Sequence, residues 1–170
     1  DTYYLAYKTV NDLNNAPLII VAAGNEGLEV GVPAPFTQPK ILTEEEDDSS
    51  APEFKKGQYA YPASFVGLDK MIVVGAVDSS DNAPYFTNWG DSVDIAAPGE
   101  SIYSTYSPLA EDEEDTKGNI YAYLNGTSMA APHVTGAAAL LKACFPNASA
   151  LQIRNALISG ADKNVNPAVY

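Results

Sequence analysis

At residues 125–134 the chain reads Asn-Gly-Thr-Ser-Met-Ala-Ala-Pro-His-Val, and an apolar, alanine-rich stretch follows. The pattern predicts a tight glycine turn that delivers Ser128 to the first turn of a helix over Ser128–Ala143. Backbone N–H groups at a helix N-terminus are unpaired, and the dipole there favours negative charge. A serine so placed can attack a carbonyl while its own N–H helps to hold the oxyanion. The alternative is an ordinary helix capped by Thr127 or Ser128, which needs no function.

The match extends beyond the turn, because residues 136–141 read Gly-Ala-Ala-Ala-Leu-Leu. The whole run closely resembles the serine-nucleophile block of subtilisin-like serine proteases. This resemblance implies that Ser128 is the nucleophile. It also implies that the chain corresponds to roughly the C-terminal half of such a peptidase domain, and that it begins inside a larger domain.

A second motif, Ala-Ala-Gly-Asn-Glu-Gly at residues 22–27, follows a short apolar run. Asn with flanking glycines is ordinary turn chemistry, but here it resembles the family's oxyanion-hole segment. The resemblance implies that Asn25 donates its side-chain amide to the tetrahedral intermediate. By alignment to the family, the residues expected to bind substrate are Ala22, Ala23, Gly24, Ala60, Asn125 and Thr127. Four of them, Ala22, Ala23, Gly24 and Ala60, are expected to border the pocket for the residue before the scissile bond. These residues are small, which leaves room there for a large apolar or aromatic side chain of the substrate.

The remaining pattern predicts an α/β fold. Residues 2–14 show helical periodicity, and the continuous apolar runs Leu18–Ala23 and Met71–Val77 are typical of strands buried on both faces of a parallel sheet. Ser149 and Gln152 have capping-box spacing and open a last helix, with Gly160 placed to end it. We therefore expect part of a subtilisin-like, mostly parallel sheet with helices on both faces.

Residues 1–170 are expected to form one half-domain, with insertions at about 28–59 and 106–119 and no separate second domain. Both insertions lack periodicity and carry the acid runs Glu44–Asp48 and Glu111–Asp115. We interpret the runs as solvated surface, with a cation site as the alternative. Catalysis needs no cofactor, and the family resemblance makes structural calcium possible, with unknown ligands.

The formal net charge of −13 argues against nucleic acid or an anionic membrane as a partner. No stretch is long enough to span a membrane. The single cysteine, Cys144, cannot form an internal disulfide and is expected on the apolar side of a helix. By family resemblance the protein is expected to be secreted or extracytoplasmic.

The base that a serine nucleophile requires is not evident. His133 is the only histidine, and it follows Ser128 by five residues on the same helix. That spacing places it roughly 140° around the helix axis from the serine, so it points elsewhere. Asp78, Asp81 and Asp94 do not match the family's aspartate motif either.

The family resemblance, taken with these observations, implies a serine endopeptidase whose nucleophile and oxyanion hole lie in this chain. The missing Asp and His are expected from the N-terminal segment of the same peptidase domain, as a separate chain after a cut in the precursor. The substrate is a polypeptide. The alternatives are a catalytically inactive subtilisin-like binding or assembly module, and a processed fragment.

Overall fold

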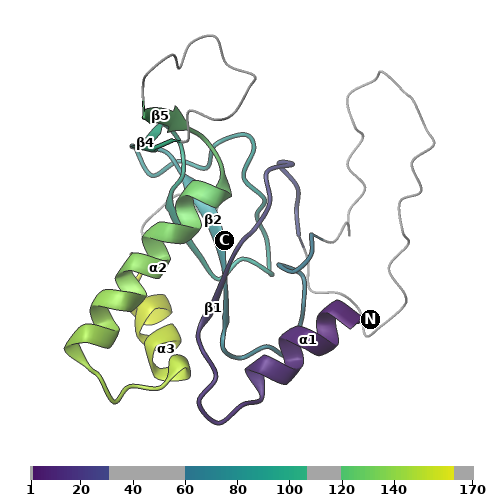
Figure 1. Ribbon diagram of the computed structural model, residues 1–170. Helices are drawn as coiled ribbons and strands as arrows, with labels where there is room; N and C mark the ends of the chain where they lie inside the picture. Colours follow the sequence, from purple (N-terminus) through teal and green to yellow (C-terminus); the bar gives the residue numbers. More distant parts are fainter. Residues whose placement is uncertain (1, 31–59, 107–119, 163–170) are drawn as a thin grey trace.

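The computed structural model describes residues 2–30, 60–106 and 120–162, and all structural statements concern these ranges. Along the described part of the chain one helix is followed by five strands and then by two helices, and Figure 1 shows how the labelled elements are arranged. In order they are α1 (Thr2–Asn11), β1 (Ile19–Ala22), β2 (Met71–Val77), β3 (Ile95–Pro98), β4 (Ile102–Thr105), β5 (Tyr121–Leu124), α2 (Thr127–Cys144) and α3 (Ala150–Gly160).

The sheet that organises the fold is parallel, with strand order β1-β2-β3. Val21 of β1 lies beside Val73 of β2, and on the opposite edge of β2 Val74 lies beside Ile95 of β3. All seven residues of β2 are buried, because this strand has a neighbour on each edge and a packed layer on each face. Both predicted strands are confirmed within a residue of their ends, but the expected burial on both faces holds for β2 alone, since all four residues of β1 are only half-buried.

Side chains of β2 alternate between two hydrophobic clusters, one on each face of the sheet. Met71 and Val73 belong to the first cluster, against which Tyr4 and Tyr7 of α1 pack. Ile72, Val74 and Ala76 belong to the second, together with Ala130 and Val134 of α2. The expectation of helices on both faces is therefore confirmed, and Figure 1 shows α1 on one side of β1 and β2 with α2 and α3 on the other.

The last helix, α3, begins at a local cap and is tied to the sheet by the side chain of Arg154. The expected capping box at Ser149 and Gln152 is present. Arg154 donates from its Nη2 to Asp94 Oδ1 at 2.6 Å and from its Nε to the carbonyl oxygen of Met71 at 2.7 Å. The other Asp94 oxygen accepts from the Val73 N–H at 2.9 Å. Helix α3 is thereby held to the N-terminal end of β2.

The hairpin β4–β5 is a feature that the sequence did not reveal. The two strands pair antiparallel, with Tyr103 opposite Tyr123, and three tyrosine rings, including that of Tyr121, gather on one face. Strand β5 leads directly into the turn before α2. The hairpin thus forms the approach to the serine turn.

Several expected boundaries were wrong. Helix α1 ends at Asn11 rather than at residue 14. The insertion placed at 28–59 starts too early, because Leu28 and Val30 are buried in the core. The insertion placed at 106–119 likewise loses Tyr106, whose N–H donates to the carbonyl oxygen of Ile120 at 2.7 Å. The rest of both insertions, with both acid runs, lies outside the described residues.

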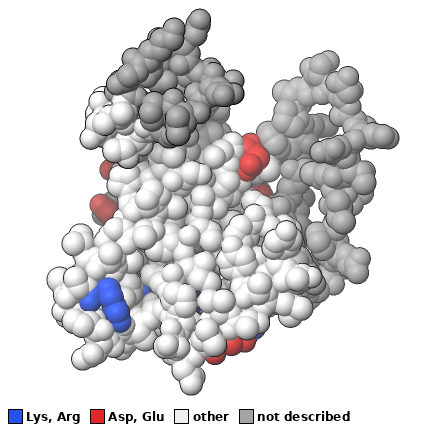
Figure 2. Space-filling model, in the orientation of Figure 1, with Lys and Arg blue, Asp and Glu red and all other residues white. Residues whose placement is uncertain are grey.

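The surface bears on two further predictions. Cys144, which was expected on the apolar side of a helix, lies at the end of α2 and is exposed. On the face shown in Figure 2, uncharged side chains predominate and charged ones are sparse. Among the described helices, none combines the length and the apolar composition that crossing a membrane requires.

Candidate active site

The site is built around the turn that precedes α2. Gly126 is the N-cap residue, with φ of 150°, and its N–H donates to the carbonyl oxygen of Gly99 at 2.8 Å. Ser128 is the second residue of the helix and is exposed. Among the described residues the Ser128 N–H has no hydrogen-bond acceptor, so it remains available to an outside oxygen.

Gly99 lies at the end of β3, where the backbone passes close to this turn. A Cβ added there would lie 2.8 Å from the carbonyl oxygen of Gly126 and 2.6 Å from the Cβ of Ala76 in β2. Only a residue without a side chain fits between the sheet and the serine turn. The structure thus gives Gly99 a role in packing.

Thr127, the first residue of α2, is completely buried. The helix has no side-chain N-cap hydrogen bond, so capping by Thr127 or Ser128 was the wrong alternative. Instead the Thr127 hydroxyl accepts from the Gly24 N–H at 3.2 Å and lies 2.9 Å from Asn25 Oδ1, to which it donates. Thr127 therefore joins the serine turn to the loop after β1.

Asn25 lies exposed on that loop, with its carboxamide oriented by Thr127. Its Oδ1 accepts from both the backbone N–H (2.8 Å) and the hydroxyl (2.9 Å) of Thr127. With the oxygen end so fixed, the amide nitrogen is the end left to donate. That nitrogen lies beside Gly126, 3.4 Å from where a Cβ would be. Residues 25 and 128, separated by a hundred positions, thus contribute to one surface.

His133 does not join this group. Its Nδ1 lies 2.8 Å from the carbonyl oxygen of Met129, one turn back on the same helix. A carbonyl oxygen only accepts, so Nδ1 carries the proton and is engaged by the helix itself. This contact agrees with the expectation that His133 points away from the serine.

The other residues expected to bind substrate are placed as follows. Gly24 is half-buried, and Ala22 is the half-buried last residue of β1. Ala23 is fully buried in the first hydrophobic cluster, against which the half-buried Ala60 packs. Asn125 is exposed, and its Oδ1 accepts from the Ser101 N–H at 2.6 Å, which ties the turn to the hairpin.

The sequence analysis missed Asn88, a buried residue that holds the Asn25 loop through its carboxamide. Asn88 stands in the run Phe-Thr-Asn-Trp-Gly at residues 86–90, to which the sequence analysis gave no role. An uncharged amide 63 positions from Asn25 carries no spacing signal of its own.

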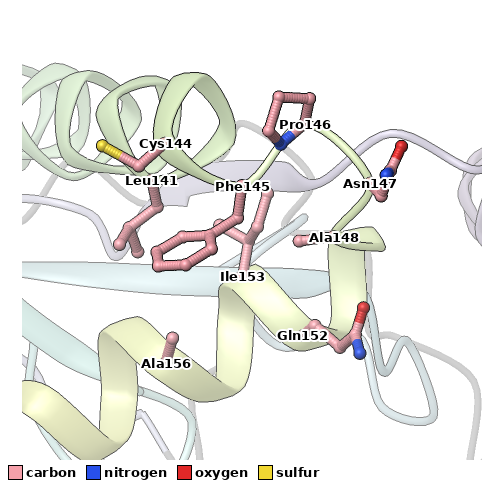
Figure 3. Close-up of a pocket in the computed structure, with 9 residues that line it drawn as sticks. All are labelled: Leu141, Cys144, Phe145, Pro146, Asn147, Ala148, Gln152, Ile153 and Ala156. Carbon is pink, nitrogen blue, oxygen red and sulfur yellow. The ribbon is translucent and has the colours of Figure 1, made fainter.

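No metal centre is evident in the described ranges, since none of their His, Cys, Asp and Glu residues form a group of three or more that could hold an ion. The structure does contain an apolar pocket of about 570 Å³ between the end of α2 and α3, lined by Leu141, Phe145 and Ile153 among others (Figure 3). Leu141 follows Ser128 by 13 positions on one helix. At 1.5 Å per residue the pocket therefore lies about 20 Å from the serine and is separate from the candidate site.

The fold and site together define an α/β protein that presents a serine at a helix N-terminus beside a carboxamide donor. Comparison with known proteins gives the family: the profile of the subtilase family matches residues 4–169. The chain belongs to the subtilase family.

Individual relatives agree. The chain is 48% identical over 101 residues to subtilisin DY of Bacillus licheniformis, a match that covers 59% of this chain and 32% of the relative. It is 33% identical over 162 residues to a thermostable alkaline protease of Halalkalibacterium halodurans, covering 95% of this chain and 34% of the relative. The chain therefore spans about a third of the length of these two relatives.

Solved structures confirm the fold class. A protease of Pseudoalteromonas arctica superposes with a TM-score of 0.67 at 25% identity, covering 99% of this chain and 43% of that one. A cold-adapted subtilisin-like serine proteinase gives a TM-score of 0.57 at 27% identity, with 87% of this chain and 40% of that one covered. The α/β architecture is thus that of subtilisin-like proteases.

Proposed function

We propose that the protein is a serine endopeptidase, with Ser128 as nucleophile and Asn25 as an oxyanion donor. The observation that carries the proposal is the pair of hydrogen bonds from Thr127 to Asn25 Oδ1. They leave the amide nitrogen of Asn25 to donate beside the turn that presents Ser128. Two N–H donors of different origin, one from a side chain and one from the backbone, are what a developing oxyanion requires.

In the proposed mechanism a histidine base takes the proton from Ser128 Oγ as this oxygen bonds to the scissile carbonyl carbon. The Asn25 amide and the Ser128 N–H donate to the resulting oxyanion. The histidinium then gives its proton to the leaving amine, and the acyl–serine ester is hydrolysed by water through the same steps. His133 is not proposed as this base, because its position five residues after Ser128 on the same helix places it roughly 140° around the axis from the serine.

We propose that the base and its aspartate orienter come from a segment outside these 170 residues, the N-terminal part of the same peptidase domain as a separate chain. The exposed surface supports such a partner. All four residues of β1 are only half-buried, whereas β2, of similar composition, is fully buried. Helix α1 also exposes Tyr3 and Leu5, at 78% and 60%. A strand added to the outer edge of β1 would cover apolar surface that a parallel sheet normally buries.

The proposed substrate class rests on the family resemblance, which puts small residues at the pocket for the residue before the scissile bond. We propose a polypeptide with a large apolar or aromatic side chain before the scissile bond, and action outside the cytoplasm. A peptide-library profile that shows cleavage only after Asp, Glu or Gly would contradict this specificity.

The test of the function is active-site labelling in the assembly with its partner segment. A fluorophosphonate probe should label Ser128, and Ser128→Ala should abolish both labelling and peptide hydrolysis. Thr135→Ala, on an exposed turn of the same helix, is the matched control that should keep both. If no serine is labelled in an assembly that contains the partner histidine, the chain is instead an inactive subtilisin-like binding module.

A further inference from the structure

Asn88 is a buried carboxamide, 1% exposed, whose hydrogen-bonding capacity is directed at the loop that carries Asn25. Its Oδ1 accepts from the backbone N–H groups of Glu26 (3.2 Å) and Leu28 (2.8 Å). Its Nδ2 donates to the carbonyl oxygen of Ala23 at 2.9 Å and to Glu26 Oε2 at 2.7 Å. These bonds bracket Asn25, with one partner before it in the chain and the others after it.

The segment that carries Asn88 is itself fixed to the sheet. The buried Thr87 accepts from the Ala76 N–H of β2 at 2.8 Å through its hydroxyl, which donates to the carbonyl oxygen of Asn88 at 3.1 Å. Backbone hydrogen bonds then join this segment to the loop, including Asn88 N–H to Gly24 oxygen at 3.2 Å and Gly27 N–H to Phe86 oxygen at 2.8 Å. The fully buried strand β2 is thus connected to the loop through residues 87 and 88.

The loop is also packed closely around this carboxamide. Gly24 has φ of +106°, and a Cβ added to it would lie 2.4 Å from Asn88 Nδ2. By contrast, within the part of the chain that the structure describes, the Asn25 side chain hydrogen-bonds only to Thr127, through one oxygen. The direction of its amide therefore depends on where the backbone of residues 23–28 is held.

We propose that Asn88 is a positioning residue, which aims the Asn25 amide at the oxyanion. The inference rests on the proposed function and adds a residue that contacts neither substrate nor nucleophile. Asn88 acts through Asn25, so its effect falls on the transition state, where the donor is used, and spares ground-state binding.

The experiment is a double-mutant cycle in the assembled enzyme, with peptide hydrolysis as the readout. Asn88→Ala should lower kcat by about 10- to 100-fold, the scale of a roughly 1 Å misplacement, with KM changed less than about twofold. In an Asn25→Ala background the same substitution should lower kcat by less than about threefold, because the donor it aims is already absent. Equal losses in the two backgrounds would overturn the proposal.

Asn11→Ala is the matched control. Asn11 is also a buried asparagine, 3% exposed, and its carboxamide also bonds to distant residues, donating to Asp69 and accepting from the Lys70 N–H. It lies at the end of α1 and touches no residue of the site. Its loss should lower stability while kcat stays within about twofold, so a matching fall in kcat would mean that any buried asparagine has this effect.

Two further measurements keep the inference independent of folding yield and of activity. Asn88→Asp keeps the side-chain volume and the acceptor oxygen, but it replaces the donor nitrogen with an oxygen, so that two carboxylates face each other at Glu26. This variant should show the same loss in kcat as Asn88→Ala. Full activity would overturn the proposal. Amide hydrogen exchange of the peptide 23–28 should accelerate in Asn88→Ala, and unchanged exchange would also overturn it. If the parent assembly neither hydrolyses peptide nor reacts with the fluorophosphonate, the proposed function fails, and hydrogen exchange alone decides whether Asn88 holds the loop.

Discussion

Replacing Thr127 by Val should separate two contributions of one buried hydroxyl. The substitution keeps the branched shape and the backbone N–H bond to Asn25 Oδ1, but it removes the hydroxyl contacts to Gly24 N–H and to Asn25 Oδ1 at 3.2 and 2.9 Å. The Gly24 N–H loses its acceptor, which costs about 1–3 kcal/mol of the free energy of unfolding. Asn25 keeps one of its two anchors, so kcat should fall by only about tenfold, or ~1.4 kcal/mol.

Urea denaturation followed by circular dichroism measures the first effect, as a lower midpoint at unchanged slope. Steady-state hydrolysis of a peptide by the assembled enzyme measures the second, with KM nearly constant. Thr127→Ser retains the hydroxyl and should recover most of kcat. The reasoning is refuted if Val loses no more activity than Ser, or if its kcat falls as far as that of Asn25→Ala.

Three other perturbations have outcomes that the structure specifies. Arg154→Ala should lower the free energy of unfolding by about 2–3 kcal/mol, because it leaves Asp94 without its partly buried partner. Arg154→Lys should recover only part of this free energy, since lysine lacks the forked donors of arginine. Thermal denaturation of both variants is the measurement. The pKa of Asp78 is held below its ordinary value of 3.8, chiefly by the hydrogen bond from the Asn82 backbone N–H. The ionised Asp78 side chain therefore stabilises the fold above pH 3.8, and this contribution is lost as the pH falls through the lowered pKa. The difference in melting temperature between the parent and Asp78→Ala should therefore narrow in acid, and a constant difference would contradict this. Peroxide should inactivate the enzyme through Met129, the half-buried neighbour of the nucleophile, and Met129→Leu should resist; equal sensitivity would place the damage elsewhere.

The parts of the fold that follow from local pattern could be predicted from the sequence. Met71–Val77 is a continuous apolar run, and a strand with neighbours on both edges and packing on both faces requires one. The capping box at Ser149 is likewise written in residues three apart. Helix α2 was placed within one residue at each end, because a glycine turn and a long apolar stretch mark it directly.

What could not be predicted depends on contacts between distant segments. Strands β4 and β5 are four residues each and mostly exposed, so neither shows a buried face to the sequence. Cys144 was expected on the apolar side of a helix, yet α2 ends at this residue and leaves it exposed. In the candidate site, Ser128 and Asn25 were named from motif resemblance, whereas Asn88 acts over 60 positions away through an amide that forms no motif.

The close passage at Gly99 has a consequence for experiments that read the protein through its activity. Any side chain at this position meets the Gly126 oxygen and the Ala76 Cβ at once, so the serine turn itself has to move. In a saturation library selected on peptide hydrolysis, position 99 should tolerate as few replacements as position 128. An activity screen would then make Gly99, which has no functional group, look as important as the nucleophile Ser128. A parallel measurement of folded yield would distinguish the structural role of Gly99 from the chemical role of Ser128.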